Sequence, residues 1–125
     1  MFMTAWRRSL VRVKPNKIYS LLGLATKAGR VMSGEFMTEN AIKDGSAALV
    51  IVGTDASANT TKKFRDMCTF YEVPCYSYGT KEELGHAIGK EMRASLAVID
   101  DGFARSLVKL LEVTDVDTEV AAWQK

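Results

Sequence analysis

The segment Gly85-His-Ala-Ile-Gly89-Lys90 most resembles a catalytic motif, because its glycines and lysine suggest a phosphate-binding loop. A Walker loop needs four residues between its glycines and a Ser or Thr after its lysine to hold magnesium. Here three residues separate the glycines, and Glu91 follows the lysine. We therefore expect no nucleotide hydrolysis at this segment.

Groups for acid and base chemistry are few. His86 is the one histidine of the chain, and no serine lies in the G-x-S-x-G context of a nucleophile elbow. The adjacent carboxylates of Asp100 and Asp101 are explained by the capping and dipole of a helix that begins there. The sequence therefore predicts a protein that is not an enzyme, with His86 as a structural residue or an RNA contact.

The two cysteines, Cys68 and Cys75, do not form a recognisable metal motif. A metal site needs Cys, His or carboxylate ligands that converge at close spacing, and this pair has only the distant His86 to add. We expect both cysteines to be reduced thiols in a cytosolic core, although they could in principle pair. The sequence predicts no metal and no other cofactor.

Positive charge is concentrated at the start of the chain, although the formal net charge is only +2. Residues 1–34 contain no Asp or Glu. Their basic residues are Arg7, Arg8, Arg12, Lys14, Lys17, Lys27 and Arg30. A one-sided cationic segment attracts polyanions, which favours nucleic acid as a partner. The alternative is that the first residues form a leader outside the domain.

More basic residues fall at expected helix starts and loops. They are Lys62, Lys63, Lys81, Lys90 and Arg93, in addition to Lys27 and Arg30. If these loops lie on one side of the fold, helix-start amides and nearby cations form a phosphate-binding rim. The alternative for each lysine taken singly is a solvated surface residue.

Apolar residues at helical spacing predict the elements that position these groups. A first helix is expected from Pro15 to a stop at Gly29. After an extended piece, Ser33 is expected to cap a second helix from Gly34 to about Asp44. Three more helices are expected over residues 60–71, from Thr80, and over residues 100–111.

Three apolar segments read as strands, namely residues 47–52, 73–78 and 95–99. Together with the extended piece 30–33 they alternate with the helices through short links. This alternation predicts an α/β fold, a three-layer α/β/α sandwich with a small mixed four-stranded sheet.

The 125 residues suit one domain, which we expect over residues 15–112. Residues 1–14 read as a basic N-terminal extension and residues 113–125 as an acidic C-terminal tail, frayed or folded into a short docking helix. No apolar run approaches the roughly 20 residues that cross a bilayer, and the start lacks a secretory pattern. We therefore expect a cytoplasmic monomer.

Several stretches, spread over roughly Asn16 to Leu111, together carry a family resemblance. They are Leu21-Leu-Gly-Leu-Ala-Thr-Lys-Ala-Gly29, Ser33-Gly-Glu35, Ala41-Ile-Lys-Asp-Gly45, Asn59-Thr-Thr-Lys-Lys63, Cys68-Thr-Phe-Tyr-Glu-Val-Pro74 and Leu84-Gly-His-Ala-Ile-Gly-Lys90. The succession resembles the ribosomal-protein superfamily that binds RNA kink-turns, in particular its bacterial YlxQ-type branch. The resemblance implies an α/β/α sandwich that binds ribosomal or other structured RNA.

In that superfamily the RNA face comprises the turn at Gly34, the loop near Asp55 and the hydrophobic loop before the Leu84-Gly85 helix. Its best characterised kink-turn binders carry Asn and Glu just after the glycine and Lys three residues later. Here Phe36, Met37 and Asn40 hold these positions. The resemblance therefore implies RNA binding for this chain more strongly than it implies kink-turn specificity, because that specificity depends on base-specific hydrogen bonds. We expect Phe36 and Met37 in the core, and the alternative is a stacking platform for unpaired bases.

The leading hypothesis is a noncatalytic protein that binds structured RNA, such as ribosomal RNA, through a face centred on the turn at residues 33–35. The predicted RNA-binding residues are Lys27, Arg30, Ser33, Gly34, Glu35, Phe36, Met37, Asn40, Lys43, Lys81, Gly85 and His86. The alternative is a protein interaction module of the translation apparatus that uses the same face. Exposed Phe36 and Met37 with little positive charge nearby would favour this alternative.

Overall fold

The computed structural model describes the backbone of residues 17–123 and the side chains of residues 17–113. Within this range no helix is both long enough and apolar enough to span a membrane. The expected helix start at Pro15 and the basic extension 1–14 lie outside the described residues, as do the side chains of most of the acidic tail.

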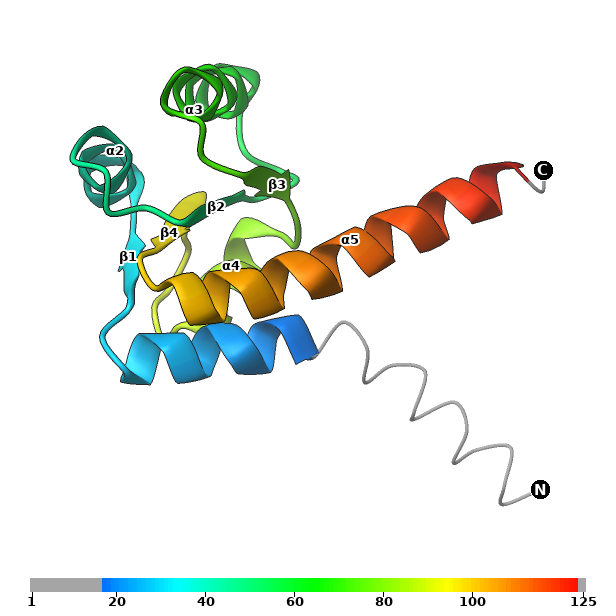
Figure 1. The fold of residues 1–125 in the computed structure, drawn as a ribbon, viewed down its shortest axis with the longest axis horizontal. Coiled ribbons are helices and arrows are strands. Elements are labelled where there is room, and N and C mark those ends of the chain that lie inside the picture. Colours follow the sequence, from blue (N-terminus) through cyan, green and yellow to red (C-terminus); the bar gives the residue numbers. More distant parts are fainter. Residues whose placement is uncertain (1–16, 124–125) are drawn as a thin grey trace.

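A mixed four-stranded sheet forms the centre of the fold, in the order β1-β4-β2-β3 (Figure 1). Its strands are β1 (Val31–Ser33), β2 (Leu49–Val52), β3 (Cys75–Ser77) and β4 (Ser95–Val98). β4 pairs antiparallel with β1 and β2, and β3 adds to β2 in parallel. Every residue of the two central strands, β2 and β4, is buried, as their apolar sequences predict.

Helices cover both faces of the sheet and complete the predicted α/β/α sandwich (Figure 1). On one face lie α2 (Glu35–Lys43) and α3 (Ala58–Tyr71). On the other face lie the helix of residues 17–27, α4 (Lys81–Ala87) and α5 (Asp101–Trp123). The three-layer fold class inferred from the sequence is therefore confirmed.

Side-chain alternation along the strands divides the interior into two cores. Leu49 and Ile51 of β2 point toward the 17–27 helix, α4 and α5, whereas Val50 and Val52 point toward α2 and α3. Successive residues of a strand point to opposite faces, so one apolar run supplies both cores. Phe64 of α3 is the largest fully buried side chain and fills the second core.

Side chains that the local sequence provides cap the starts of α3 and α4. Ser57 Oγ accepts the Thr60 N–H at 3.1 Å at the start of α3. At the start of α4, Thr80 Oγ1 accepts the Glu83 N–H at 3.1 Å, and Glu83 Oε1 accepts the Thr80 N–H at 3.0 Å. This reciprocal pair is a capping box, which confirms Thr80 as the predicted cap.

The predicted cap of α2 is wrong. Ser33 is the last residue of β1, where it pairs with Leu96, and its Oγ accepts a hydrogen bond from Arg93 Nε at 3.2 Å. Gly34 takes the N-cap position, and no side chain caps the helix. Because strand pairing fixes the backbone of Ser33, its hydroxyl serves the loop before β4 and not α2.

The last helix is longer than its apolar pattern predicts. Asp100 Oδ2 accepts the Phe103 N–H at 2.9 Å, which fits the expected capping role. The helix then runs to Trp123 and not to Leu111. Residues 112–123 contain neither glycine nor proline, so the sequence places no helix breaker there.

Candidate nucleic-acid interface

Three helices begin at the same edge of the sheet. β1 and β2 are both antiparallel to β4, and β3 is parallel to β2, so β1, β2 and β3 run in one direction. Each of these strands leads into a helix, and β4 begins at the same edge. In α/β folds this edge, at the carboxyl ends of parallel strands, is where ligands commonly bind. We call its segments 33–36, 53–57, 79–81 and 92–94 the rim.

Hydrogen bonds join neighbouring segments of the rim. The donor and acceptor pairs are Gly34 N–H to Ser95 O at 3.0 Å, Gly53 N–H to Ala94 O at 2.9 Å, Thr54 N–H to Gly79 O at 2.7 Å, Lys81 N–H to Asp55 Oδ1 at 2.8 Å and Arg93 N–H to Lys81 O at 3.1 Å. Because each segment is tied to another, the groups displayed at this edge are held in place before any ligand arrives.

The turn into α2 depends on glycine. Gly34 has φ 94° and ψ 159°, a combination that side-chain-bearing residues rarely adopt. Its carbonyl oxygen accepts the Thr38 N–H at 3.0 Å, the first hydrogen bond of the helix. Apart from Gly34 and its two chain neighbours, no atom of the described residues lies within 4 Å of the position that a Cβ on Gly34 would occupy, so the restriction comes from the backbone and not from crowding.

Phe36 and Met37 lie on the surface, which overturns their expected place in the core. Phe36 is 72% exposed and Met37 is 42% exposed. The buried face of α2 is formed by Thr38, Ala41 and Ile42, which follow helical spacing and leave positions 36 and 37 outside it. Two apolar side chains therefore stand in the first turn of α2, beside the rim.

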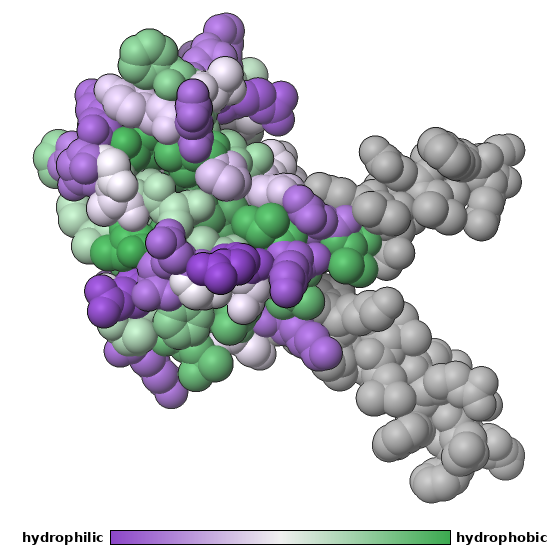
Figure 2. Space-filling view, viewed as in Figure 1, coloured by the Kyte–Doolittle hydropathy of each residue, from purple (hydrophilic) through white to green (hydrophobic). Residues whose placement is uncertain are grey.

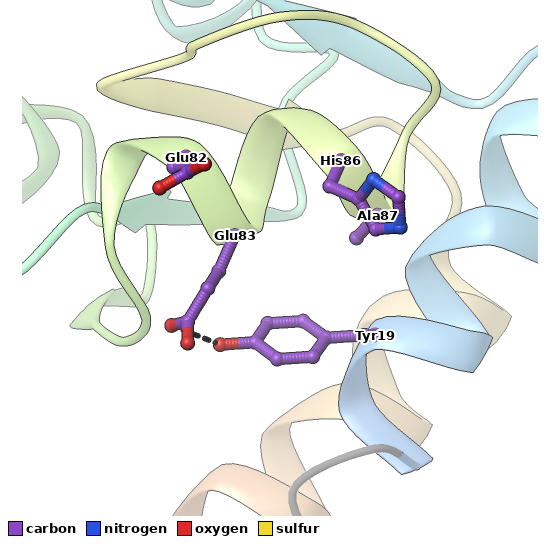
Figure 3. Close-up of a pocket in the computed structure, with 5 residues that line it drawn as sticks. All are labelled: Tyr19, Glu82, Glu83, His86 and Ala87. Carbon is purple, nitrogen blue, oxygen red and sulfur yellow. Dashed lines mark hydrogen bonds between the residues drawn. The ribbon is translucent and has the colours of Figure 1, made fainter.

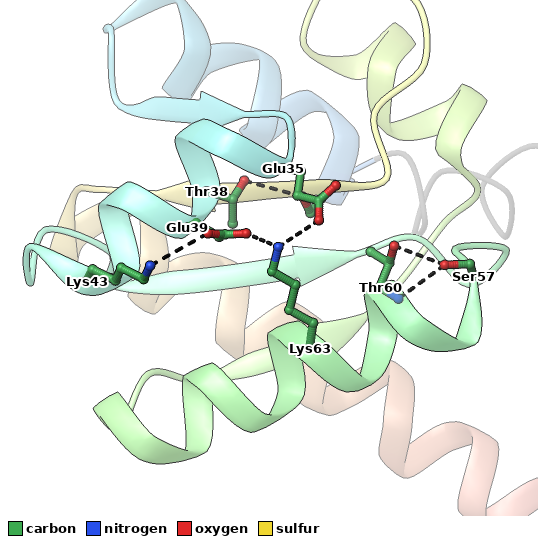
Figure 4. A network of polar contacts seen from close by, with 8 residues as sticks. Glu35, Thr38, Glu39, Lys43, Ser57, Thr60 and Lys63 are labelled. Carbon is green, nitrogen blue, oxygen red and sulfur yellow. Dashed lines mark hydrogen bonds and ion pairs between the residues drawn. The ribbon is translucent and has the colours of Figure 1, made fainter.

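The acidic groups of α2 are paired with a lysine of α3. Lys63 Nζ lies 2.7 Å from Glu35 Oε2 and also pairs with Glu39 (Figure 4). Glu39 is in addition 3.8 Å from Lys43 Nζ. Glu35 thus forms an intramolecular ion pair, and Lys63 does not present a free charge to a ligand.

Arg93 is a rim residue that the sequence-based site omitted. Its Nε donates to Ser33 Oγ at 3.2 Å and its Nη1 donates to the Met92 carbonyl at 2.8 Å. These bonds use two of the five N–H groups of a guanidinium and fix its position. Among the described residues, neither Arg93 nor Lys81 has an ion-pair partner. The run of basic residues in loops was the sequence signal for Arg93.

His86 and Lys27 lie at the other end of α4 from Lys81. His86 lines a hollow of about 270 Å³ with Tyr19, Glu82, Glu83 and Ala87 (Figure 3). It also lines an adjoining hollow that includes Lys27. The structure therefore brings these two predicted contacts together, in a groove between the 17–27 helix and α4.

A hydrogen bond crosses that groove. Tyr19 Oη donates to Glu83 Oε1 at 3.0 Å (Figure 3). The backbone hydrogen bond from Thr80, followed by that from Tyr19, lowers the pKa of Glu83. Burial and the hydrogen bond to Glu83 raise the pKa of Tyr19. Glu83 therefore serves α4 as a charged cap and links it to the 17–27 helix.

Other predicted contacts lie away from the rim. Arg30 precedes β1 and its carbonyl accepts the Ile99 N–H at the opposite edge, and Lys43 is in the last turn of α2. Asn40 is exposed beside Met37 in a shallow hollow. The structure does not gather these three residues with the turn at Gly34, and their role in RNA binding stays a prediction.

Gly85 has a packing role in the structure. It is buried in α4, and a Cβ at this position would overlap the carbonyl group of Glu91. Glycine thus allows the loop before β4 to lie against α4. Because this loop carries Arg93, the packing at Gly85 helps to position the rim.

Known proteins resemble this chain over most of its length. Over 94 residues the chain is 45% identical to the Bacillus subtilis RNA-binding protein YlxQ, covering 75% of this chain and 94% of the relative. It is 36% identical over 98 residues to the large ribosomal subunit protein eL30 of Methanosarcina mazei, covering 77% and 90%.

A solved structure shows the same fold. A Bacillus halodurans protein of unknown function is 41% identical and superimposes with a TM-score of 0.75, covering 77% of this chain and 97% of that one. Residues 16–108 match the family described as ribosomal protein L7Ae/L30e/S12e/Gadd45, which confirms the resemblance seen in the sequence. The chain belongs to the ribosomal protein L7Ae/L30e/S12e/Gadd45 family.

Proposed function

We propose that this protein binds structured RNA at the rim and catalyses no reaction. One observation carries the proposal: an exposed aromatic side chain, Phe36, stands at the start of α2, where the guanidinium of Arg93 is fixed on Ser33. Aromatic rings stack on unpaired bases, and arginine binds phosphate. Lys81 adds a second cation to the same hydrogen-bonded edge.

The rim suits an RNA that combines duplex backbone with unpaired bases. Arg93, Lys81 and the amides at the helix starts would position the phosphates, and Phe36 would stack on a base. Phe36 and Met37 cannot make the base-edge hydrogen bonds that Asn and Glu make at these positions in kink-turn binders. We therefore propose that kink-turns and ribosomal RNA loops are bound by shape and stacking.

The relatives support this assignment. The Bacillus subtilis relative is named an RNA-binding protein and the Methanosarcina mazei relative a protein of the large ribosomal subunit. On this basis we extend the proposal to a cytoplasmic protein that acts as a monomer on ribosomal or ribosome-associated RNA.

The direct test is titration of the full chain against kink-turn and ribosomal RNA fragments at several salt concentrations. We expect binding that weakens steeply with salt, because each phosphate contact releases counterions. Arg93→Gln should reduce both the affinity and the salt slope. Lys109→Gln removes one charge from α5, on the other face of the sheet, and should change neither. Failure of the folded protein to bind any fragment would overturn the proposal.

A protein interaction module is the second candidate, because exposed Phe36 and Met37 add apolar surface at the rim. On the face seen in Figure 2, hydrophobic patches alternate with hydrophilic side chains. If this is the function, a pull-down with the full chain should retain a protein of the translation apparatus and no RNA. Phe36→Ala would release that protein, whereas Arg93→Gln would leave it bound.

A further inference from the structure

Fold and packing bring the two cysteines of the chain together. Cys68 lies in the penultimate turn of α3, and Cys75 is the first residue of β3. Both belong to the core between α2, α3 and the sheet. Cys75 packs against the buried cluster that contains Cys68, and the Val73 N–H, two residues before Cys75, donates to the Cys68 carbonyl at 2.8 Å. In this structure both cysteines are free thiols, one on the helix and the other on the edge strand that follows it.

The surroundings give the two thiols different properties. Cys68 is buried, whereas Cys75 is partly exposed on the edge strand. The interaction with the Cys68 thiol, and then the charge of Arg65, lower the pKa of Cys75. The interaction with Cys75, followed by burial, raises the pKa of Cys68. An accessible thiol near a cation is the reactive kind, and a buried neighbour is suited to resolve its oxidation.

We propose that Cys68 and Cys75 are a redox modification site, at which a peroxide-class oxidant forms a reversible disulfide between α3 and β3. The Cys75 thiolate attacks one peroxide oxygen, the O–O bond breaks, and a sulfenic acid forms with release of water after proton uptake. Cys68 then attacks the Cys75 sulfur, the S–O bond breaks and a second water leaves. One peroxide is reduced and two thiols are oxidised to one disulfide.

The disulfide would fix the ends of α3 and β3 that lie farthest from the rim. Cys68 and Cys75 are linked by a short connection that includes Glu72 in the left-handed region and Pro74. β3 is a strand of three residues at the edge of the described sheet, where it pairs with β2. A covalent link should therefore reduce local opening of the edge. The site does not depend on RNA binding and is tested without RNA.

The test uses the reduced full chain treated with hydrogen peroxide at neutral pH. The protein is then denatured, its free thiols are blocked with a maleimide, and its intact mass is measured. We expect a monomer that carries no maleimide and has lost the mass of two hydrogens, and a dithiol should restore both thiols. Two maleimide adducts, a cross-linked dimer or a sulfinic acid as the main product would overturn the proposal.

Variants separate the roles of the two cysteines. In Cys68→Ser, Cys75 should stop at a sulfenic acid that dimedone traps. In Cys75→Ser, the buried Cys68 should stay unmodified while the protein is folded. Circular dichroism identifies a variant that does not fold. In that case the mass of the oxidised wild-type protein alone decides whether the disulfide forms.

Arg65→Gln should slow the peroxide reaction, because the charge of Arg65 lowers the pKa of Cys75 and so favours its thiolate. Arg105→Gln is the matched control, because Arg105 is an exposed residue of α5 on the other side of the sheet. Equal rates in the two variants would remove Arg65 from the site. Hydrogen exchange over residues 68–77 should slow in the oxidised protein.

Discussion

Lys63 Nζ of α3 contacts Glu35 Oε2 of α2 at 2.7 Å and pairs with Glu39 in the next turn. One lysine thus neutralises two carboxylates beside the surface proposed to face RNA (Figure 4). Unpaired carboxylates at this place would repel phosphate. In the proposed RNA complex, Lys63 would therefore act through Glu35 and Glu39, without itself contacting the RNA.

Lys63→Gln should weaken RNA binding about three- to tenfold at low salt, because it removes the positive charge that pairs with Glu35 and Glu39 near the phosphates. The free energy of unfolding should change by less than about 1 kcal/mol, since both partners are substantially exposed. Lys62→Gln is the control, because Lys62 pairs with Asp66 on its own helix. Adding Glu35→Gln to Lys63→Gln should recover part of the affinity. Equal losses for Lys62→Gln and Lys63→Gln would contradict this role.

Phe36→Ala should lower RNA affinity by about 1–3 kcal/mol, the range for one base stacked on an aromatic ring. The side chain is 72% exposed, so thermal stability should stay within the range of surface substitutions. Fluorescence anisotropy with a labelled RNA measures the loss. Phe36→Tyr keeps the ring and should bind like wild type. Phe70→Ala is a matched control, since Phe70 is an exposed aromatic residue on α3.

Gly34→Ala should destabilise the protein by about 1–3 kcal/mol, because the backbone at φ 94° and ψ 159° lies in a region open essentially to glycine alone. Gly34→Asn should be no better, since asparagine tolerates the left-handed helical region and not this one. Urea unfolding measures both variants. If Gly34→Asn were more stable than Gly34→Ala, the turn would have relaxed to another backbone conformation.

Glu83 makes stability depend on acid pH. Hydrogen bonds from Thr80 and Tyr19 lower its pKa in the folded state. A lowered folded pKa contributes stability that is present above the unfolded value of about 4.3 and is lost as the pH falls through the folded value. Glu83→Gln should therefore destabilise the protein at neutral pH, and its difference from wild type should shrink at pH values below the unfolded pKa.

Urea unfolding across the acid range measures this effect. The matched control is Glu82→Gln, which changes an exposed residue of the same helical turn and keeps the capping box intact. A Glu83→Gln deficit that is constant with pH would show that lost packing, and not lost charge, causes it.

Local sequence determined much of the fold. The apolar runs of β2 and β4 marked the two central strands, and Thr80 with Glu83 marked the start of α4. These features depend on residues a few positions apart, or on one strand covered on both faces, so they can be read without knowing the neighbours. Family motifs spread along the chain indicated the α/β/α sandwich, whereas the strand order β1-β4-β2-β3 came from the structure.

The site depended on contacts between distant residues. Ser33 was expected to cap a helix, yet it binds Arg93, which is 60 positions away. Phe36 was expected in the core because it is apolar, yet the α2 face that packs on the sheet excludes it. The direction in which a side chain points follows from which face of its element is covered, and this is decided by packing.

By itself the sequence determined an α/β/α family member with a glycine turn at Gly34, because backbone preference and hydrophobic period are local properties. Only the tertiary structure decided that Arg93 binds Ser33 at the turn, that Lys63 pairs with Glu35, and that Cys68 and Cys75 share one core. The physical reason is that ion pairs, hydrogen bonds and thiol contacts act over a few ångströms. Distances that short between remote residues exist only once the sheet has brought its helices together.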